Sequence, residues 1–293
     1  MANATDPRNA HPDEFDEQKQ DSQPGHLSEM SPAPDHGERS YRGHGKLEGR
    51  CALISGGDSG IGRAVAIAYA REGADVALIH LPEEEDDAAS TAELVADAGR
   101  RVLTIAGDVR DEDFCRDAVA RTVDTLGGLD ILVLNAAYQQ DRDGIESITT
   151  EEWDRVMRTN LYSMLWLTAA ARPHLHDGSS IITTTSVQAF NPSPQLVDYA
   201  MTKAAQVAFT KALAQDLGEA GIRVNAVAPG PIWTPLIPAT DWPEEKIAEF
   251  GSDTPLGRAG QPAELAGAYV YLASDDATYV SGAILAVTGG KPL

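Results

Sequence analysis

A tyrosine and a lysine four residues apart, Tyr199 and Lys203, are the pair in this sequence best suited to acid–base chemistry. On a helix, positions i and i+4 lie on one face, so the phenol and the ammonium would be neighbours. A nearby ammonium favours the phenolate and is expected to lower the pKa of the tyrosine toward neutrality. Such a tyrosine serves as general base for an alcohol or general acid for a carbonyl. The alternative is a surface pair without function, because this spacing is common by chance.

A serine is expected near that pair. Ser186 follows an apolar segment, residues 180–185, that is typical of a buried strand. In parallel sheets, ligands bind outside the carboxyl ends of the strands. Ser186 is therefore predicted to lie at the same sheet edge as a glycine-rich turn earlier in the chain.

That turn spans residues 55–62, which read SGGDSGIG and follow the apolar segment 51–55. Gly56 permits a sharp turn, Gly60 lets a pyrophosphate approach the backbone, and Gly62 allows close packing of helix on strand. The helix that follows offers free N–H groups and a partial positive charge to phosphates. The spacing differs from the commoner dinucleotide fingerprint, and a tight turn without a ligand is the alternative.

The end of the second predicted strand, residues 75–80, bears on the choice between NAD and NADP. An Asp or Glu there would bind the ribose 2′-hydroxyl of NAD, and a nearby Arg would accept the 2′-phosphate of NADP. This sequence has His80, with no Arg beside it. Asp58 and the acidic run 83–87 would repel a 2′-phosphate if they point inward, but such runs are commonly solvated helix starts. Both cofactors stay open.

Short apolar segments alternate with helical stretches from Lys46 to the end of the chain. The predicted strands are 51–55, 75–80, 102–106, 129–135, 180–186, 222–228 and 283–287. The predicted helices are 61–71, 86–98, 111–126, 150–173, 197–219 and 262–273. This alternation predicts an α/β fold: a single doubly wound Rossmann-type domain over residues 46–293, with about seven parallel strands and helices on both faces.

Residues 46–293 resemble the short-chain dehydrogenase/reductase (SDR) family. The motifs that carry the resemblance are residues 56–62, Asp108-Val109, Asn135-Ala136-Ala137, Asn160, Ser186, Tyr199 with Lys203, and Pro229-Gly230 with Thr234. Ala137 stands where the family more often has Gly, and Ser55 where it usually has Thr.

The resemblance implies a hydride transfer between NAD or NADP and an alcohol or carbonyl substrate. Tyr199 would be the catalytic acid/base, and Lys203 would lower its pKa and bind the nicotinamide ribose. Ser186 would orient and polarise the substrate oxygen. Asn160 would hold a water that links Lys203 to solvent; an ordinary buried asparagine is the alternative.

The resemblance also implies a set of cofactor contacts. Asp108 would bind the adenine amino group with Val109 packed on the ring, and Thr234 would contact the carboxamide. The full cofactor set is Gly56, Asp58, Ser59, Gly60, Ile61, Gly62, His80, Asp108, Val109, Asn135, Ala136, Ala137, Tyr199, Lys203, Pro229, Gly230, Ile232 and Thr234. The substrate set is Ser186, Gln188 and Tyr199.

The substrate loop is expected between residues 232 and 254. It contains Trp233, Leu236, Ile237, Trp242 and Phe250, and Gln139, Gln140, Gln188 and Phe190 are expected to add to the pocket wall. This mixture suits a sugar, a polyol or a small aldehyde or ketone. The aromatic residues are equally consistent with packing or hinge roles.

Residues 1–45 form an acidic segment rich in Pro and Gln, with few large apolar residues. Such a segment cannot bury enough apolar surface to fold alone, so we expect a disordered tail or an arm lying on the domain or a neighbouring subunit. Tyr41 and residues 23–32 are the expected anchors, and no chemistry is expected there. The arm resembles that of a bacterial subgroup of oxidoreductases that includes stress-associated and glucose- or ribitol-dehydrogenase-like proteins.

Composition excludes several classes of function. The chain has 293 residues and a net charge of −22, which disfavours binding to nucleic acid and to anionic membranes. No apolar run is long enough to span a bilayer, and the polar N-terminus does not read as a signal peptide. Cys51 and Cys115 lack the spacing of a metal site or disulfide framework, so we expect free thiols, no metal and a cytoplasmic location.

The resemblance implies a homotetramer joined through the long helices and the last strand. Two other functions remain as hypotheses. One is a dinucleotide-binding sensor or scaffold without catalysis, since a fold alone does not fix function. The other is a stress-related interaction protein that acts through its acidic arm.

Overall fold

The strands are short apolar segments buried on both faces. In the computed structural model, which describes residues 5–293, every residue of β1 (Cys51–Ser55) and β2 (Asp75–His80) is buried. Strands covered by helices on both faces lose water from both, which explains their continuous apolar sequences.

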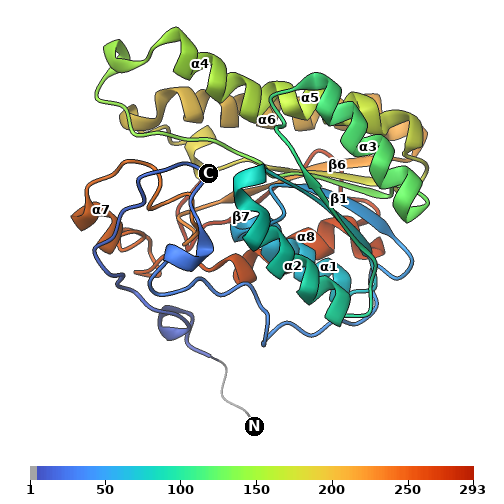
Figure 1. The fold of residues 1–293 in the computed structure, drawn as a ribbon, viewed down its shortest axis with the longest axis horizontal. Coiled ribbons are helices and arrows are strands. Elements are labelled where there is room, and N and C mark those ends of the chain that lie inside the picture. Colours follow the sequence, from blue (N-terminus) through green and yellow to red (C-terminus); the bar gives the residue numbers. More distant parts are fainter. Residues whose placement is uncertain (1–4) are drawn as a thin grey trace.

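Residues 5–293 form one parallel sheet of seven strands in the order β3-β2-β1-β4-β5-β6-β7 (Figure 1). The remaining strands are β3 (Val102–Ala106), β4 (Ile131–Leu134), β5 (Ser180–Thr184), β6 (Arg223–Pro229) and β7 (Ile284–Val287). The predicted doubly wound α/β fold is confirmed. The strand order changes direction between β1 and β4, the point at which such sheets open a crevice for ligands.

The helices cover both faces of this sheet (Figure 1). One layer contains α1 (Gly60–Arg71), α2 (Glu85–Asp97) and α8 (Pro262–Ala273). The other contains α3 (Glu112–Leu126), α4 (Thr150–Met157), α5 (Ser163–Ala171) and α6 (Val197–Asp216). Helix α1 is rich in alanine and almost wholly buried, so it packs closely against both the sheet and α8.

Two segments differ from the prediction. The single helix expected over 150–173 is divided into α4, a five-residue π-helical segment (Arg158–Tyr162) and α5. It ends before Pro173, which cannot continue a helical hydrogen-bond ladder. A short helix, α7 (Glu244–Ala248), was not predicted because five residues are too few to show helical periodicity.

The N-terminal segment lies on the domain, which favours the arm over the disordered tail. Residues 5–45 contain only two short 3₁₀ turns among the described residues. Tyr41 is an anchor as expected, since its hydroxyl donates to Glu72 Oε1 over 2.7 Å. Phe15 and Met30 are buried in a cluster with Trp233 and Trp242. The first four residues of the predicted 1–45 segment lie outside the described residues.

The two cysteines are buried free thiols, as predicted. No helix among residues 5–293 has the length and apolar character needed to cross a membrane. Within the same residues, no cluster of three or more His, Cys, Asp or Glu side chains is placed to hold a metal ion.

Candidate active site

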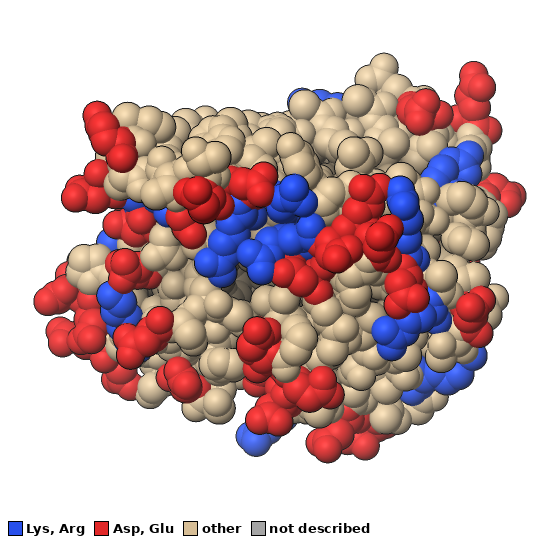
Figure 2. Space-filling view, turned by 45° about the horizontal axis from the view of Figure 1, so that its top comes forward, with Lys and Arg blue, Asp and Glu red and all other residues tan. Residues whose placement is uncertain are grey.

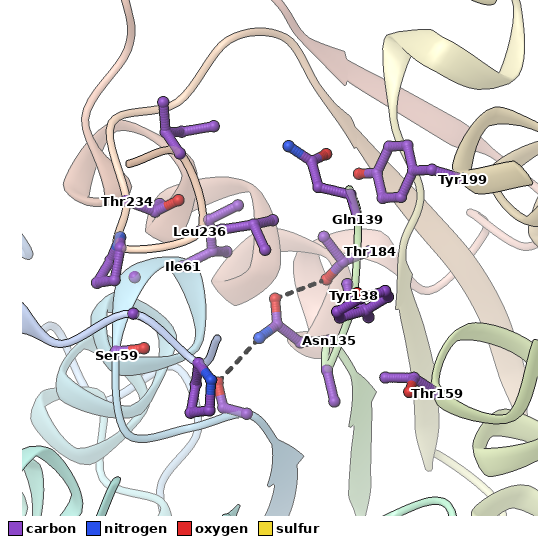
Figure 3. Close-up of a pocket in the computed structure, with 18 of the residues that line it drawn as sticks. Ser59, Ile61, Asn135, Tyr138, Gln139, Thr159, Thr184, Tyr199, Thr234 and Leu236 are labelled. Carbon is purple, nitrogen blue, oxygen red and sulfur yellow. Dashed lines mark hydrogen bonds between the residues drawn. The ribbon is translucent and has the colours of Figure 1, made fainter. Parts of the chain in front are cut away.

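A cleft of about 320 Å³ lies at the carboxyl edge of the sheet. Its walls come from the segments that follow β1 to β6, from the loop before α7 and from the N-terminal arm. Figure 3 shows part of this lining, with Ser59, Ile61 and Thr234 facing Tyr199 and Gln139 across the cleft. The prediction that Ser186 and the glycine turn share one sheet edge is confirmed, because both line this cleft.

The glycine turn has the geometry that requires glycine. Gly56 and Gly60 have φ angles of +63° and +50°, which L side chains rarely adopt. A Cβ at Gly62 would lie 1.8 Å from the Gly56 carbonyl oxygen, so Gly62 allows α1 to pack against the turn. Gly62 itself does not line the cleft. The Ser59 side chain accepts no hydrogen bond from the first turn of α1. The backbone N–H groups at the start of that helix therefore have no capping partner in Ser59 and can bind a ligand.

Asn135 ties together three strand ends beneath the cleft (Figure 3). Its side-chain Nδ2 donates to the Gly56 carbonyl over 2.9 Å, and its Oδ1 accepts from Thr184 Oγ1 over 3.1 Å. Its backbone N–H donates to Ser55 Oγ over 3.0 Å. Ser55, which retains the hydroxyl of the family's threonine, therefore has a structural function at the base of the turn.

Tyr199, Lys203 and Ser186 meet at the opposite wall of the cleft. Tyr199 and Lys203 lie on successive turns of α6, with Lys203 Nζ 5.2 Å from the centre of the Tyr199 ring. Lys203 Nζ donates to the Thr184 carbonyl over 2.7 Å. Ser186 follows β5, and its Oγ accepts the Gln188 backbone N–H over 3.1 Å. Helix α6 and the end of β5 thus hold these three of the four predicted catalytic residues in place.

Burial dominates the acid–base properties of this trio. Lys203 is only 1% exposed, and burial lowers its pKa to about 7. Burial raises the pKa of Tyr199 to about 12, while its hydrogen bond with Ser186 acts in the opposite direction. Burial therefore opposes the expected lowering of the tyrosine pKa by Lys203, because it disfavours the charged forms of both groups.

Asn160 lies behind the cleft wall and does not line it. It belongs to the π-helical segment and is fully buried. Its side chain accepts the Tyr138 N–H over 2.8 Å and donates to Thr202 Oγ1 over 3.1 Å, while its carbonyl accepts from Gln206 Nε2 over 2.8 Å. Asn160 thus joins α6 to the segment after β4.

The end of the cleft near β2 is lined by carboxyl groups. Asp58 is 1% exposed, and burial raises its pKa to about 6. Burial also raises the pKa of Glu84 to about 8, and the nearby charges of Asp58 and Asp87 act in the same direction. Glu84 Oε2 accepts the Leu81 N–H over 3.0 Å, which holds it beside His80. Of the acidic residues that the sequence singled out here, Asp58 and Glu84 line the cleft.

An arginine also lies at this end, although none is adjacent to His80 in the sequence. Arg110 lines the cleft, and its Nε donates to the Asp108 carboxylate over 2.8 Å. The carboxylate expected to bind adenine is therefore already paired. The lining contains Arg110, Arg155, Lys203 and Lys291 against Asp58, Glu84 and Asp108, so the cleft is less negative than the chain as a whole. Figure 2 shows Lys and Arg side chains gathered beside a hollow, between groups of acidic side chains.

The segment after β6 forms the remaining wall. Gly230 packs against β7, since a Cβ there would lie 2.8 Å from Thr288 Cα. Leu236, Ile237, Trp242 and Phe250 line the cleft as predicted. Trp233, Phe190 and Gln140 do not: Trp233 is fully buried, with its ring stacked on Phe15.

The cleft brings together nearly all predicted site residues. They are Gly56, Asp58, Ser59, Gly60, Ile61, His80, Asp108, Val109, Asn135, Ala136, Ala137, Ser186, Gln188, Tyr199, Lys203, Pro229, Gly230, Ile232 and Thr234. Sequence reasoning missed Arg110, Arg155, Thr159 and Lys291, which carry no motif. It also missed Gln23, Pro24 and Gly25 as site residues, although it singled out this triplet as an anchor.

Comparison with known proteins agrees with this geometry. Residues 56–291 match the family model described as Enoyl-(Acyl carrier protein) reductase. The chain is 53% identical to the uncharacterized oxidoreductase YhxD of Bacillus subtilis (strain 168), over 96% of this chain and 94% of that protein. It is 45% identical to the glucose and ribitol dehydrogenase of Daucus carota, over 94% of this chain and 97% of that protein.

A solved structure shares the whole domain. The crystal structure of a short-chain dehydrogenase from Burkholderia cenocepacia J2315 in complex with NADP superposes with a TM-score of 0.78 at 31% identity. The match covers 84% of this chain and 98% of that one. The glycine turn, the Ser186–Tyr199–Lys203 wall and these matches together show that the chain belongs to the short-chain dehydrogenase/reductase family of oxidoreductases.

Proposed function

We propose that this protein transfers a hydride between a nicotinamide cofactor and an alcohol or carbonyl substrate, with Tyr199 as the general acid/base. The observation that carries the proposal is the meeting of Ser186, Tyr199 and Lys203 opposite the glycine turn in one cleft. Because one fold can serve many functions, the argument for catalysis rests on this arrangement of side chains and not on the fold.

The lining fits a dinucleotide. The turn at residues 56–61 and the N-terminus of α1 would receive the diphosphate, where glycines leave the backbone accessible. Asp108, Val109 and His80 would lie toward the adenosine, and Ile232 and Thr234 toward the nicotinamide. When bound, the cofactor supplies or accepts the hydride, and the protein aligns it and manages the proton.

The proton chemistry follows from the chain's own residues. Ser186 would hold the substrate oxygen beside the Tyr199 hydroxyl. A phenol with a pKa of about 12 retains its proton near neutral pH, which suits it to protonate a carbonyl oxygen. Lys203, with a pKa of about 7, exchanges protons readily near neutrality and would restore the phenol. Asn160 would position the water that links Lys203 to solvent, acting through its place in the π-helical segment.

We infer a preference for NAD over NADP. The buried Asp58 and the adjacent Glu84 lie at the end of the cleft that would receive the adenosine ribose. Burial already raises the pKa of both carboxyl groups, so their negative forms are costly in this part of the cleft. A dianionic 2′-phosphate would make ionisation of these groups costlier still, whereas the neutral 2′-hydroxyl of NAD would not. Arg110 does not offset them, since its guanidinium is already paired with Asp108.

The substrate side suits a small polar molecule. Gln139 and Gln188 supply amide groups, while Leu236, Trp242 and Phe250 supply apolar wall. This mixture matches a sugar, polyol or small aldehyde or ketone, the class to which the name of the Daucus carota relative also points.

Titration with NADH and NADPH, followed by turnover of sugars, polyols and aldehydes, tests the proposal. We expect NADH to bind at least tenfold more tightly than NADPH. Tighter binding of NADPH would overturn the preference alone. Cofactor binding without turnover of any alcohol or carbonyl would favour the non-catalytic sensor, and binding of neither would overturn the proposal.

We also propose a homotetramer. Large apolar side chains are exposed on the layer of α4 to α6, among them Trp153, Tyr162, Leu165 and Met201. Leu165 is 56% exposed, which is unusual for an unpartnered leucine on a central helix. Light scattering coupled to size exclusion should give about four times the chain mass of 31.1 kDa, whereas a monomer mass would refute the assembly.

A further inference from the structure

The N-terminal arm crosses over the cleft and is fastened on both sides of it. The Gln20 N–H donates to the Pro238 carbonyl over 3.0 Å, on the side of the substrate loop. The Leu27 N–H donates to Asp87 Oδ2 over 3.0 Å, at the first turns of α2. Between these two points, Gln23, Pro24 and Gly25 line the cleft.

Residues 20–26, here called the arm loop, are closed by one side chain. Gln20 is 5% exposed, and its Oε1 accepts the His26 N–H over 2.6 Å. Its Nε2 donates to the His26 carbonyl over 2.9 Å. This double hydrogen bond joins the ends of the arm loop, so its tip at residues 23–25 has a defined position rather than a range of positions.

The tip packs directly beside the proposed diphosphate site. A Cβ at Gly25 would lie 2.4 Å from the Pro235 carbonyl oxygen, so only glycine permits this approach. Pro235 follows Thr234, and a Cβ at Gly60 in the glycine turn would lie 3.1 Å from Thr234 Cγ2. The arm loop, Thr234 and the glycine turn therefore form one continuous stretch of cleft wall.

Gln23 brings a polar group to this wall. Its Nε2 donates to the Gln139 carbonyl over 2.8 Å. Its Oε1 is buried and has no hydrogen-bond partner among the described residues. In Figure 3 the Tyr199 hydroxyl is directed toward Gln139, so Gln23 joins the arm to the side of the cleft that carries Tyr199. A buried acceptor without a partner is costly unless a bound molecule supplies a donor.

We propose that the arm loop is part of the cofactor site: Gln23, Pro24 and Gly25 cover the bound dinucleotide and slow its release. This inference rests on the proposed function, because it takes the occupant of the cleft to be a nicotinamide dinucleotide. A ligand enclosed by the loop dissociates only when the contacts at Gln20, Gln23 and Leu27 open. The arm is then a component of the binding site rather than an accessory tail.

Two variants and a matched control test the proposal in the full-length protein. Gln20→Ala removes the bonds that close the arm loop, and Gly25→Val forces its tip away from the Pro235 carbonyl. Gln18→Ala is the control, because Gln18 makes the same kind of amide pair with the Ser31 backbone but lies outside the cleft. The readout is the NADH dissociation rate, measured by stopped-flow displacement, with equal thermal midpoints required of all four proteins.

We expect both loop variants to release NADH about tenfold faster than wild type and Gln18→Ala to stay within about twofold. Gln23→Ala should also raise the NADH dissociation constant. Hydrogen exchange at residues 20–27 should slow when NADH is added. Unchanged dissociation rates in Gln20→Ala and Gly25→Val, with NADH bound normally, would overturn this inference and leave the proposed function intact. A change in the substrate KM without any change in NADH dissociation would also overturn the inference about the arm loop. Failure of the wild type to bind either dinucleotide would instead overturn the proposed function.

Discussion

The sheet and the N-terminal arm both reach the cleft, but different interactions hold them. The sheet is a continuous ladder of backbone hydrogen bonds with buried apolar residues on both faces. The arm is held by side chains that bind backbone groups, by isolated backbone bonds such as that from Gln20 to Pro238, and by the buried Phe15 and Met30 side chains. Arg71 donates to the Gly37 and Tyr41 carbonyls, and Glu72 accepts the His44 N–H and Lys46 N–H.

This difference suggests two kinds of stability in one chain. Residues of the sheet share a cooperative core, so their loss weakens the whole domain. The arm has few apolar contacts within itself, so we expect it to open locally without unfolding the sheet.

The largest expected effect is on catalysis at the sheet edge. Tyr199→Phe removes the hydroxyl that exchanges the proton and should lower kcat by about 1,000-fold. The NADH dissociation constant should stay within about twofold, because the ring remains. Tyr41→Phe is the matched control in the arm; it removes the bond to Glu72 and should retain near-normal kcat. Equal activity of Tyr199→Phe and wild type would remove Tyr199 from the mechanism.

Core truncation in the sheet should have the next largest effect. Leu53 lies in the middle of β1 and is fully buried. Leu53→Ala should lower the free energy of unfolding by about 2–5 kcal/mol, because a cavity remains after partial relaxation. Chemical denaturation followed by circular dichroism measures this loss. A change below about 1 kcal/mol would contradict a tightly packed sheet core.

A comparable truncation in the arm should cost the domain less. The Phe15 ring stacks on Trp233 with 3.8 Å between ring centroids, and Phe15 is as buried as many core residues. Phe15→Ala should expose Trp233 and shift its fluorescence to the red. The unfolding midpoint should move by less than half the shift seen for Leu53→Ala, because the arm opens first. An equal or larger shift would show that arm and sheet unfold together.

The smallest effect is expected at Glu84, in the pH dependence of stability. Burial raises the pKa of Glu84 in the folded protein to about 8, from an ordinary value of 4.5. Between these values the folded state keeps a proton that the unfolded state releases, so stability falls as pH rises from about 4.5 to 8. Glu84→Gln keeps an oxygen that accepts the Leu81 N–H. The decrease in Tm between pH 4.5 and pH 8 should be smaller in this variant than in wild type, by a few degrees. An unchanged pH profile would show that Glu84 titrates normally.

Much of the fold and site was accessible from the sequence. Residues buried on both faces leave continuous apolar runs, so the limits of β1, β2 and β3 were recovered from 51–55, 75–80 and 102–106. The glycine turn and Ser186 each follow directly after a strand that the sequence predicts. Because the carboxyl ends of parallel strands lie at the same edge of a sheet, the sequence was enough to place both at that edge. The break in the 150–173 helix was not accessible, because an alanine-rich helix and a π-helical segment differ little in residue pattern.

The sequence by itself determined the parallel α/β architecture and the meeting of the Ser186, Tyr199 and Lys203 wall with the glycine turn, since these follow from short-range periodicity and strand order. Only the tertiary structure decided the protonation preference of Tyr199, because burial is set by distant segments that pack around it. Tertiary structure also decided the place of the arm. Gln23 meets Gln139 through a contact 116 residues apart along the chain, and no local pattern encodes such a pairing.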